Sequence, residues 1–261
     1  MTQQDEEKLS AGVGISEEKS NVDPALLEEM VKAGVLYGRR KAKTNPRMQR
    51  YIFTTRNGAE ILDIVQTVPM IERAAQFLAE IVKKKETILF VGTTPASREY
   101  VRATAEKFGY PYVTERWLGG TLTNFKTIFQ RLQYYLKLKA DRQAGRLEKY
   151  TKKERTGFDK EIERLTFLFK GLEVITKLPQ AIVILGVSSH DTTVREARRL
   201  KIPVVGIISS DADPDLIDYP IPANDFSKTS VQWVLQRFES VIEAARKEAI
   251  VPPSIPPTEK K

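Results

Sequence analysis

A run of cations near the N-terminus is the part of the sequence with the clearest chemistry. Between Met30 and Ala59 there are eight Lys and Arg residues and no Asp or Glu. A solvated protein face normally mixes both signs, whereas an acid-free run rich in arginine suits bidentate contact with phosphate oxygens. Tyr37 and Tyr51 flank the run and could stack on bases or pack on sugars. The run therefore predicts a phosphate-binding surface.

The predicted RNA contacts gather in and around this run. They are Tyr37, Arg39, Arg40, Lys41, Lys43, Asn45, Arg47, Arg50 and Arg56, with Arg116 and Lys126 as secondary phosphate contacts. Asn45-Pro46 is a turn signal, which we expect to fix the loop that presents the cations over 38–50. Five aspartates and no cation lie between Asp211 and Asp225. Since the two signs occupy separate stretches of the chain, we expect one surface to meet phosphates and another to face away from them.

A nucleotide site is the first alternative reading. Val91-Gly92-Thr93-Thr94 follows a strand-like run and precedes a helix, where a phosphate could sit on the helix N-terminus. Neither G-x-G-x-x-G nor G-x-x-x-x-G-K-[ST] occurs in the sequence. A lone glycine at a strand end usually serves a tight turn, so we expect no bound cofactor.

The sequence offers little support for a metal site or a catalytic site. There is no cysteine, and the single histidine, His190, is expected to cap a helix or to face solvent. Residues 211–222 look like a calcium loop, but Leu216 stands where that loop needs glycine and Pro222 where it needs a bidentate glutamate. We expect a turn-rich loop whose Asp side chains bond to backbone amides, with no metal site and no enzymatic activity.

The composition indicates a folded protein with a polyanionic partner. A chain of 261 residues with 41% hydrophobic content can bury a sizeable core, and a net charge of +8 favours a polyanion. The polar, acidic start argues against a signal peptide, and no apolar run approaches the roughly 18–20 residues that span a bilayer. We expect a soluble, cytoplasmic protein without a membrane partner.

Alternating strands and helices must position these residues. Continuous apolar runs at 87–91, 181–185 and 203–208 are typical of buried parallel strands, with shorter extended pieces at 110–113 and 220–222. Residues 51–53 and 61–64 read as two strands around the Arg56-Asn57-Gly58 turn. Helices are expected over 24–34, 68–84, 95–108, 191–200 and 227–247. The pattern predicts an α/β domain, a parallel sheet flanked by helices, over 21–120 and 176–247.

Residues 121–175 form a different unit. Their apolar residues have coiled-coil spacing in two series: Leu122, Phe125, Phe129, Leu132 and Leu136, then Phe158, Ile162, Leu165, Phe169 and Leu172. Thr151-Lys-Lys-Glu154 matches a capping box that could start the second helix. We predict an inserted antiparallel helical hairpin, with disordered tails at 1–20 and 248–261. Arg116-Trp117-Leu118-Gly119-Gly120 is the corner where the chain leaves the sheet, and we expect Trp117 to bury its ring in that junction.

Several motifs in one order then identify a family. The chain resembles the bacterial-type small-subunit ribosomal protein two family from about Asp23 to Ile242. The motifs are Asn45-Pro46-Arg47-Met48, Tyr51-Ile52-Phe53, Thr67-Val68-Pro69, Leu89-Phe90-Val91-Gly92-Thr93, Arg116-Trp117-Leu118-Gly119-Gly120, Glu196-Ala197, and Ile217-Asp218-Tyr219-Pro220-Ile221-Pro222-Ala223-Asn224-Asp225. The resemblance implies a flavodoxin-like sheet with an inserted hairpin, no enzymatic activity and binding of small-subunit ribosomal RNA. It also implies neighbouring ribosomal proteins as partners, in many bacteria including small-subunit ribosomal protein one.

The chain departs from the family pattern near its N-terminus. Leu36 and Arg39 stand where the family usually has histidines, and Thr44 where it has tryptophan. Asp191 stands at another common histidine position, and Ser209-Ser210 where Asp-Thr is frequent. These changes remove contacts that used imidazole or indole and leave the positive charge in place.

The sequence thus predicts a structural, ribosome-bound constituent of the small subunit that binds ribosomal RNA through a basic N-terminal loop. Contacts to RNA shape and backbone are expected to outweigh contacts to base edges. Two rival hypotheses are a non-ribosomal scaffold of the same fold and a small-molecule-binding α/β enzyme.

Overall fold

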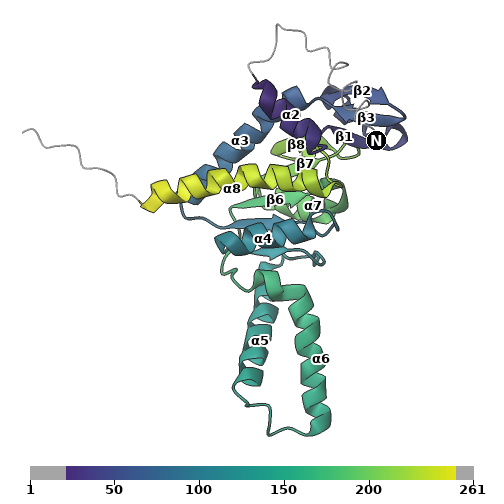
Figure 1. Ribbon diagram of the computed structural model, residues 1–261. Helices are drawn as coiled ribbons and strands as arrows, with labels where there is room; N and C mark the ends of the chain where they lie inside the picture. The colour runs from purple at the N-terminus through teal and green to yellow at the C-terminus, as the bar shows by residue number, and fades with distance from the viewer. Residues whose placement is uncertain (1–21, 251–261) are drawn as a thin grey trace, which may run out of the picture.

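The computed structural model describes residues 22–250 (Figure 1). The predicted N-terminal tail, 1–20, lies outside the described residues, and so does 251–261. The last helix, α8 (Lys228–Ile250), continues through residues 248–250, so the predicted C-terminal tail begins three residues too early. No helix within 22–250 is long and apolar enough to cross a membrane.

A five-stranded parallel sheet forms the centre of the molecule. Its strands are β4 (Ile88–Val91), β5 (Tyr112–Val113), β6 (Ala181–Leu185), β7 (Val204–Ile208) and β8 (Tyr219–Pro222), in the spatial order β5-β4-β6-β7-β8. Every neighbouring pair is parallel. Numbered along the chain the order is 2-1-3-4-5, the one typical of flavodoxin-like sheets. All residues of β4, β6 and β7 are buried, which explains their continuous apolar sequences.

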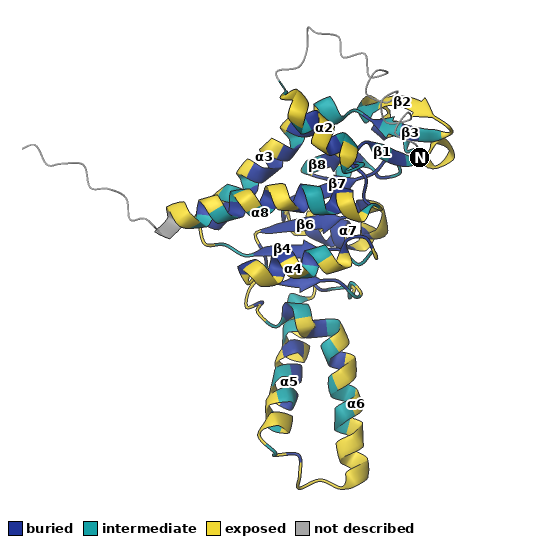
Figure 2. Cartoon of the chain, viewed as in Figure 1, coloured by how far each residue is buried: buried dark blue, intermediate teal, exposed yellow. Residues whose placement is uncertain are grey.

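Successive strand residues face opposite sides of this sheet, so it has two cores (Figure 2). On one side Phe90 and Val183 pack under four helices: α2 (Pro24–Lys32), α3 (Ile64–Lys83), α4 (Arg98–Phe108) and α8. On the other side Leu89 and Ile182 pack with α7 (Asp191–Arg199) and with residues of α5 (Phe125–Gln143) and α6 (Lys152–Phe169). The parallel α/β prediction is therefore confirmed.

The basic run is more regular than the predicted loop. Its residues form a strand, β1 (Tyr37–Arg40), and two short 3₁₀ helices, η1 (Lys41–Lys43) and η2 (Pro46–Tyr51). β1 joins β3 (Ala59–Leu62) and β2 (Ile52–Arg56) in an antiparallel sheet of order β1-β3-β2, hereafter the small sheet. The predicted turn is present, with φ of 51° at Asn57 and 75° at Gly58.

Capping residues in the sequence predicted several helix starts correctly, and one helix start was predicted incorrectly. Asp23 accepts a hydrogen bond from the Ala25 amide at the start of α2, and Thr151 and Glu154 form the predicted capping box at the start of α6. The helix predicted over 68–84 begins earlier, at Ile64, because Asp63 accepts from the amides of Val65 and Gln66. The expected strand 61–64 therefore ends at Leu62.

Helices α5 and α6 lie in the chain between β5 and β6 and project away from the sheet (Figure 1). Their buried side chains are Leu132, Tyr135, Leu138, Leu165 and Phe169. Tyr135 is fully buried and its ring stacks on Phe169. Its hydroxyl accepts from the Thr166 hydroxyl at 3.1 Å and donates to a Glu173 carboxylate oxygen at 2.8 Å. The predicted apolar series omitted Tyr135, because its hydroxyl makes it a weaker signal in a hydrophobic pattern.

Candidate nucleic-acid interface

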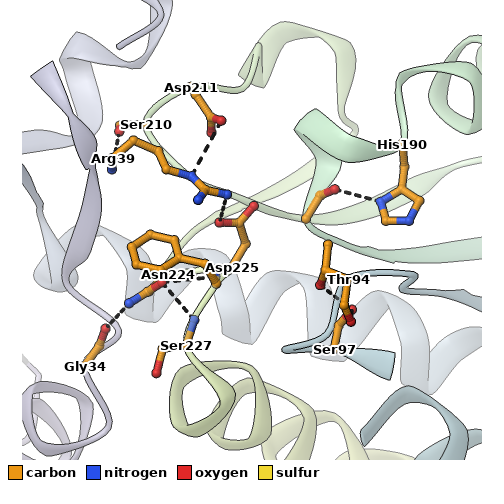
Figure 3. A network of polar contacts seen from close by, with 12 residues as sticks. Gly34, Arg39, Thr94, Ser97, His190, Ser210, Asp211, Asn224, Asp225 and Ser227 are labelled. Atoms are coloured by element: carbon orange, nitrogen blue, oxygen red, sulfur yellow. Dashed lines mark hydrogen bonds and ion pairs between the residues drawn. The ribbon is translucent and has the colours of Figure 1, made fainter. Parts of the chain in front are cut away.

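The small sheet is held against the carboxyl ends of β7 and β8. The Arg39 amide donates to Ser210 Oγ at 2.8 Å, and the Asn45 amide donates to the Ser210 carbonyl at 2.8 Å. The Asn224 side chain donates to the Gly34 carbonyl at 3.0 Å (Figure 3). Gly38 permits this approach, since a Cβ there would lie 3.0 Å from Ser210 Oγ. The basic run and the acidic run therefore lie against each other, although they are far apart in sequence.

Arg39 is engaged inside the protein. Its Nη2 donates to Asp225 Oδ1 at 2.9 Å, its Nε lies 3.6 Å from Asp211 Oδ2, and its guanidinium lies 4.5 Å from the centre of the Phe226 ring. Asp225 is 2% exposed, and its burial raises the pKa of that carboxyl to about 6 although the charge of Arg39 opposes the shift. The predicted phosphate contact Arg39 thus neutralises a buried carboxylate.

Arg47 and Arg50 also have acidic partners. Arg47 Nη1 lies 2.5 Å from Asp213 Oδ2, and Arg50 Nη2 lies 2.5 Å from Asp215 Oδ1. These pairs join η2 to η5 (Pro214–Leu216). The expectation that the acidic run lies on a surface away from the cations is wrong, because the fold packs the two runs together and their opposite charges attract.

Four exposed cations of the run remain without an ion pair among residues 22–250: Arg40, Lys41, Lys43 and Arg56. They gather at one end of the small sheet, where the Lys41 amide donates to the carbonyl of Gly58 in the β2–β3 turn. A cation that makes no ion pair can neutralise an incoming anion without first losing a carboxylate partner. Of the predicted contacts within this run, these four are the cations that have no salt-bridge partner among residues 22–250.

The uncharged predicted contacts have structural roles. Asn45 Oδ1 accepts from the Arg47 amide at 3.0 Å and so caps η2, as the turn signal implied. Tyr37 is half-buried in β1 beside Gly34. Tyr51, which the sequence paired with Tyr37, is half-buried under the Arg50 guanidinium, 5.1 Å from its ring centre.

The corner at residues 116–123 is organised by Glu196 of α7. This carboxylate is 7% exposed and accepts from Trp117 Nε1 (3.0 Å), from the amides of Gly120, Leu122 and Thr123 (2.8–3.1 Å), and from the Thr123 hydroxyl. Burial alone would raise the pKa of Glu196, but these hydrogen bonds hold it below its ordinary value. The Trp117 ring is half-buried, less than predicted.

Sequence reasoning missed this role of Glu196, since nothing local marks a glutamate as the acceptor for a segment some 75 residues away. The predicted secondary contacts Arg116 and Lys126 flank the corner, and both are exposed. Neither forms an ion pair within 22–250.

His190 lies at the carboxyl ends of β4 and β6, the switch point of strand order at which doubly wound sheets bind ligands. Its Nδ1 lies 2.7 Å from the Gly186 carbonyl, and its Nε2 accepts from the Thr93 amide at 3.2 Å. Burial lowers the pKa of this imidazole, so it is neutral and carries its proton on Nδ1. His190 is the N-cap residue of α7, but its side chain makes no capping hydrogen bond, and the predicted exposure to solvent is wrong. The Thr93 amide that a phosphate would need already has an acceptor.

The acidic loop behaves as its turn chemistry predicted. Asp213 Oδ1 accepts from the Asp215 amide, and Asp218 Oδ2 accepts from the Val204 amide. Within the part of the chain that the structure describes, no three His, Cys, Asp or Glu residues are grouped as metal ligands.

The fold and this surface together define a class: an α/β protein that presents a cationic small sheet at the carboxyl edge of its parallel sheet. The family model described as "Ribosomal protein S2" matches residues 30–245. Small ribosomal subunit protein uS2 of Thermus thermophilus is 40% identical over 226 residues, 87% of this chain and 88% of that protein. The uS2 protein of Nocardia farcinica is 42% identical over 199 residues, 76% of this chain and 70% of that protein.

The chain belongs to the ribosomal protein S2 family. It is a structural constituent of the small ribosomal subunit and not an enzyme.

Proposed function

We propose that the chain binds small-subunit ribosomal RNA through Arg40, Lys41, Lys43 and Arg56, with Arg116 and Lys126 as secondary contacts. One observation carries the proposal: the four cations are exposed and unpaired in the described residues, whereas Arg39, Arg47 and Arg50 of the same run have carboxylate partners. Phosphate binding by Lys and Arg releases counterions, so free cations supply most of the affinity. The three paired arginines fasten the small sheet and η2 to the body and orient the free ones.

Neutralising the four free cations tests this assignment. The variant Arg40→Gln/Lys41→Gln/Lys43→Gln/Arg56→Gln is expected to bind small-subunit RNA more weakly and to lower the slope of log K against log salt by about three, since each lost phosphate contact contributes roughly 0.7–0.9. Binding is measured by filter retention from low to high salt. The matched control is Arg47→Gln/Arg50→Gln. If the control lowers the slope as much as the fourfold variant does, the division into free and fastening cations is wrong.

Ribosome association in the cytoplasm is tested by sedimentation. A subunit constituent travels with small subunits through a sucrose gradient, whereas a non-ribosomal scaffold of the same fold stays near the top. Neighbouring ribosomal proteins are the expected protein partners, and small-subunit ribosomal protein one stays a hypothesis that a pull-down with that protein tests.

We further propose that α5 and α6 form an antiparallel hairpin inserted into the α/β domain as a separable appendage. An ion pair between Arg142 and Asp159 (2.7 Å) supports their side-by-side arrangement, and the buried side chains of both helices lie outside residues 141–160. Replacing residues 141–160 by a four-glycine loop is therefore expected to shift the melting temperature of the body by only a few degrees. Circular dichroism follows the melting, with Leu165→Asp as the disruptive control. Loss of cooperative unfolding in the shortened chain would show that the hairpin is part of the core.

A further inference from the structure

The register of the small sheet places its side chains on two distinct faces. Thr55 pairs with Glu60 and Ile52 pairs with Leu62, and Glu60 and Leu62 are buried. Glu60 is held there by the hydroxyls of Thr44 and Thr55. Residues directly opposite each other in an antiparallel pair share a face. On the central strand β3 this inner face therefore points into the protein, whereas Thr55 on the edge strand β2 is exposed although it shares that face. The intervening residues form the outer face.

Two of the free cations stand in one row of that outer face. Arg40 pairs with Ala59, and Ala59 pairs with Arg56 on the next strand. Because adjacent strands are ~4.8 Å apart, the two arginine backbones lie about 10 Å from each other, on either side of a methyl group. The neighbouring row holds Tyr37, Ile61 and Thr54, which pair in the same way. The small side chain of Ala59 leaves room above the sheet between the two guanidinium groups.

Phe53 is the unusual residue beside these rows. Between Ile52 and Thr54 the register shifts, so Phe53 is an extra residue with no partner on β3. Such a bulge typically re-aims a side chain. The ring is 53% exposed, and Thr54, Thr55 and Arg56 that follow it are exposed as well, as the yellow colour of β2 shows (Figure 2). An aromatic ring is thus presented to solvent about 10 Å along the strand from Arg56.

We propose that the small sheet takes an unpaired nucleotide of RNA beside its edge strand β2, with its base stacked on the exposed Phe53 ring and phosphates contacted by Arg40 and Arg56. This inference rests on the proposed RNA-binding function and adds to it a class of target: RNA with a bulged or single-stranded base rather than a continuous duplex. Charge complementarity selects RNA as the occupant, because the outer face and η1 present four cations that have no ion pair within residues 22–250, and neither carries an acid. An exposed aromatic beside cations is the arrangement with which proteins hold unstacked bases.

The experiment compares two RNAs and three forms of the full chain. One RNA is a duplex with a single unpaired 2-aminopurine, and the other is the same duplex fully paired. Wild type is expected to prefer the bulged RNA and to quench the 2-aminopurine. Phe53→Ala is expected to bind the bulged RNA roughly tenfold more weakly, to lose the quenching, and to bind the paired RNA as before. Phe167→Ala, which removes a ring that is 57% exposed on α6, is the matched control and should behave as wild type.

Three outcomes would overturn the inference. The first is equal affinity of wild type for both RNAs. The second is a Phe53→Ala variant that binds the bulged RNA and quenches the 2-aminopurine as wild type does. The third is a Phe53→Ala defect that appears only in subunit assembly, because a neighbouring protein would then cover the ring. None of these affects the proposed function, which fails separately if the fourfold neutral variant keeps its affinity for both RNAs.

Discussion

Glu196→Ala is expected to lower the free energy of unfolding by about 3–5 kcal/mol, since it leaves up to five buried or half-buried donors without an acceptor. The donors are the Trp117 indole, the amides of Gly120, Leu122 and Thr123, and the Thr123 hydroxyl. These groups belong to the corner that joins β5 to α5. Chemical denaturation measures the loss, and hydrogen exchange should show these three amides exchanging faster than those of β4.

One further variant tests how much the charge of Glu196 contributes to stability, and a second variant serves as an exposed control. Glu196→Gln keeps the size of the side chain but turns one acceptor into a donor. This variant should therefore lose some stability relative to wild type, but less than Glu196→Ala loses. The pKa of Glu196 is lowered in the folded state, so its contribution is present above the unfolded pKa and is lost as pH falls through the folded one. The glutamine variant should lack that acid-side loss. Glu243→Ala removes an exposed partner of Lys107 and should leave the free energy of unfolding nearly unchanged, because water and salt screen exposed ion pairs.

Arg39→Ala is expected to cost about 3 kcal/mol at pH 7.5, because it leaves the buried Asp225 carboxylate without its counter-charge. The pKa of Asp225 is raised to about 6 with Arg39 present, and removal of the guanidinium raises it further. A carboxyl whose folded pKa lies above its unfolded value of 3.8 favours folding most when protonated, so stability falls as pH rises through this window. The cost of Arg39→Ala should therefore shrink below about pH 5.

Denaturant unfolding of Arg39→Ala between pH 4 and pH 8 measures this dependence. In the double variant Arg39→Ala/Asp225→Asn the buried charge is gone, so most of the stability at pH 7.5 should return. Arg47→Ala is the matched control, since its pair with Asp213 is more exposed and should be worth less than about 1 kcal/mol at any pH. A cost of Arg39→Ala that does not vary with pH would contradict the assignment of Arg39 as the counter-charge of Asp225.

Many elements of the fold could be predicted because their signals are local. The strands at 181–185 and 204–208 are buried on both faces and so are apolar without interruption. Thr151 and Glu154 cap a helix through atoms three residues apart, and Asn57-Gly58 turns a hairpin by its own φ angles. The same locality explains a miss: β1 has the sequence Tyr-Gly-Arg-Arg, without an apolar alternation, and is a strand only because β3 lies beside it.

For the candidate site, too, local features could be predicted from the sequence and long-range contacts could not. The sequence by itself determined the presence and order of a set of cations with no acid among them. It also determined that the turn at Asn45-Pro46 lies within this set. Only the tertiary structure decided which of them stay available, because it brings residues 211–225 against 39–50. Carboxylates there compensate Arg39, Arg47 and Arg50, whereas Arg40, Lys41, Lys43 and Arg56 have no ion pair in the described part of the chain. The physical reason is that Coulomb attraction depends on the distance between charges in space. The packing of the small sheet on β7 and β8 sets that distance, and no local sequence pattern indicates it.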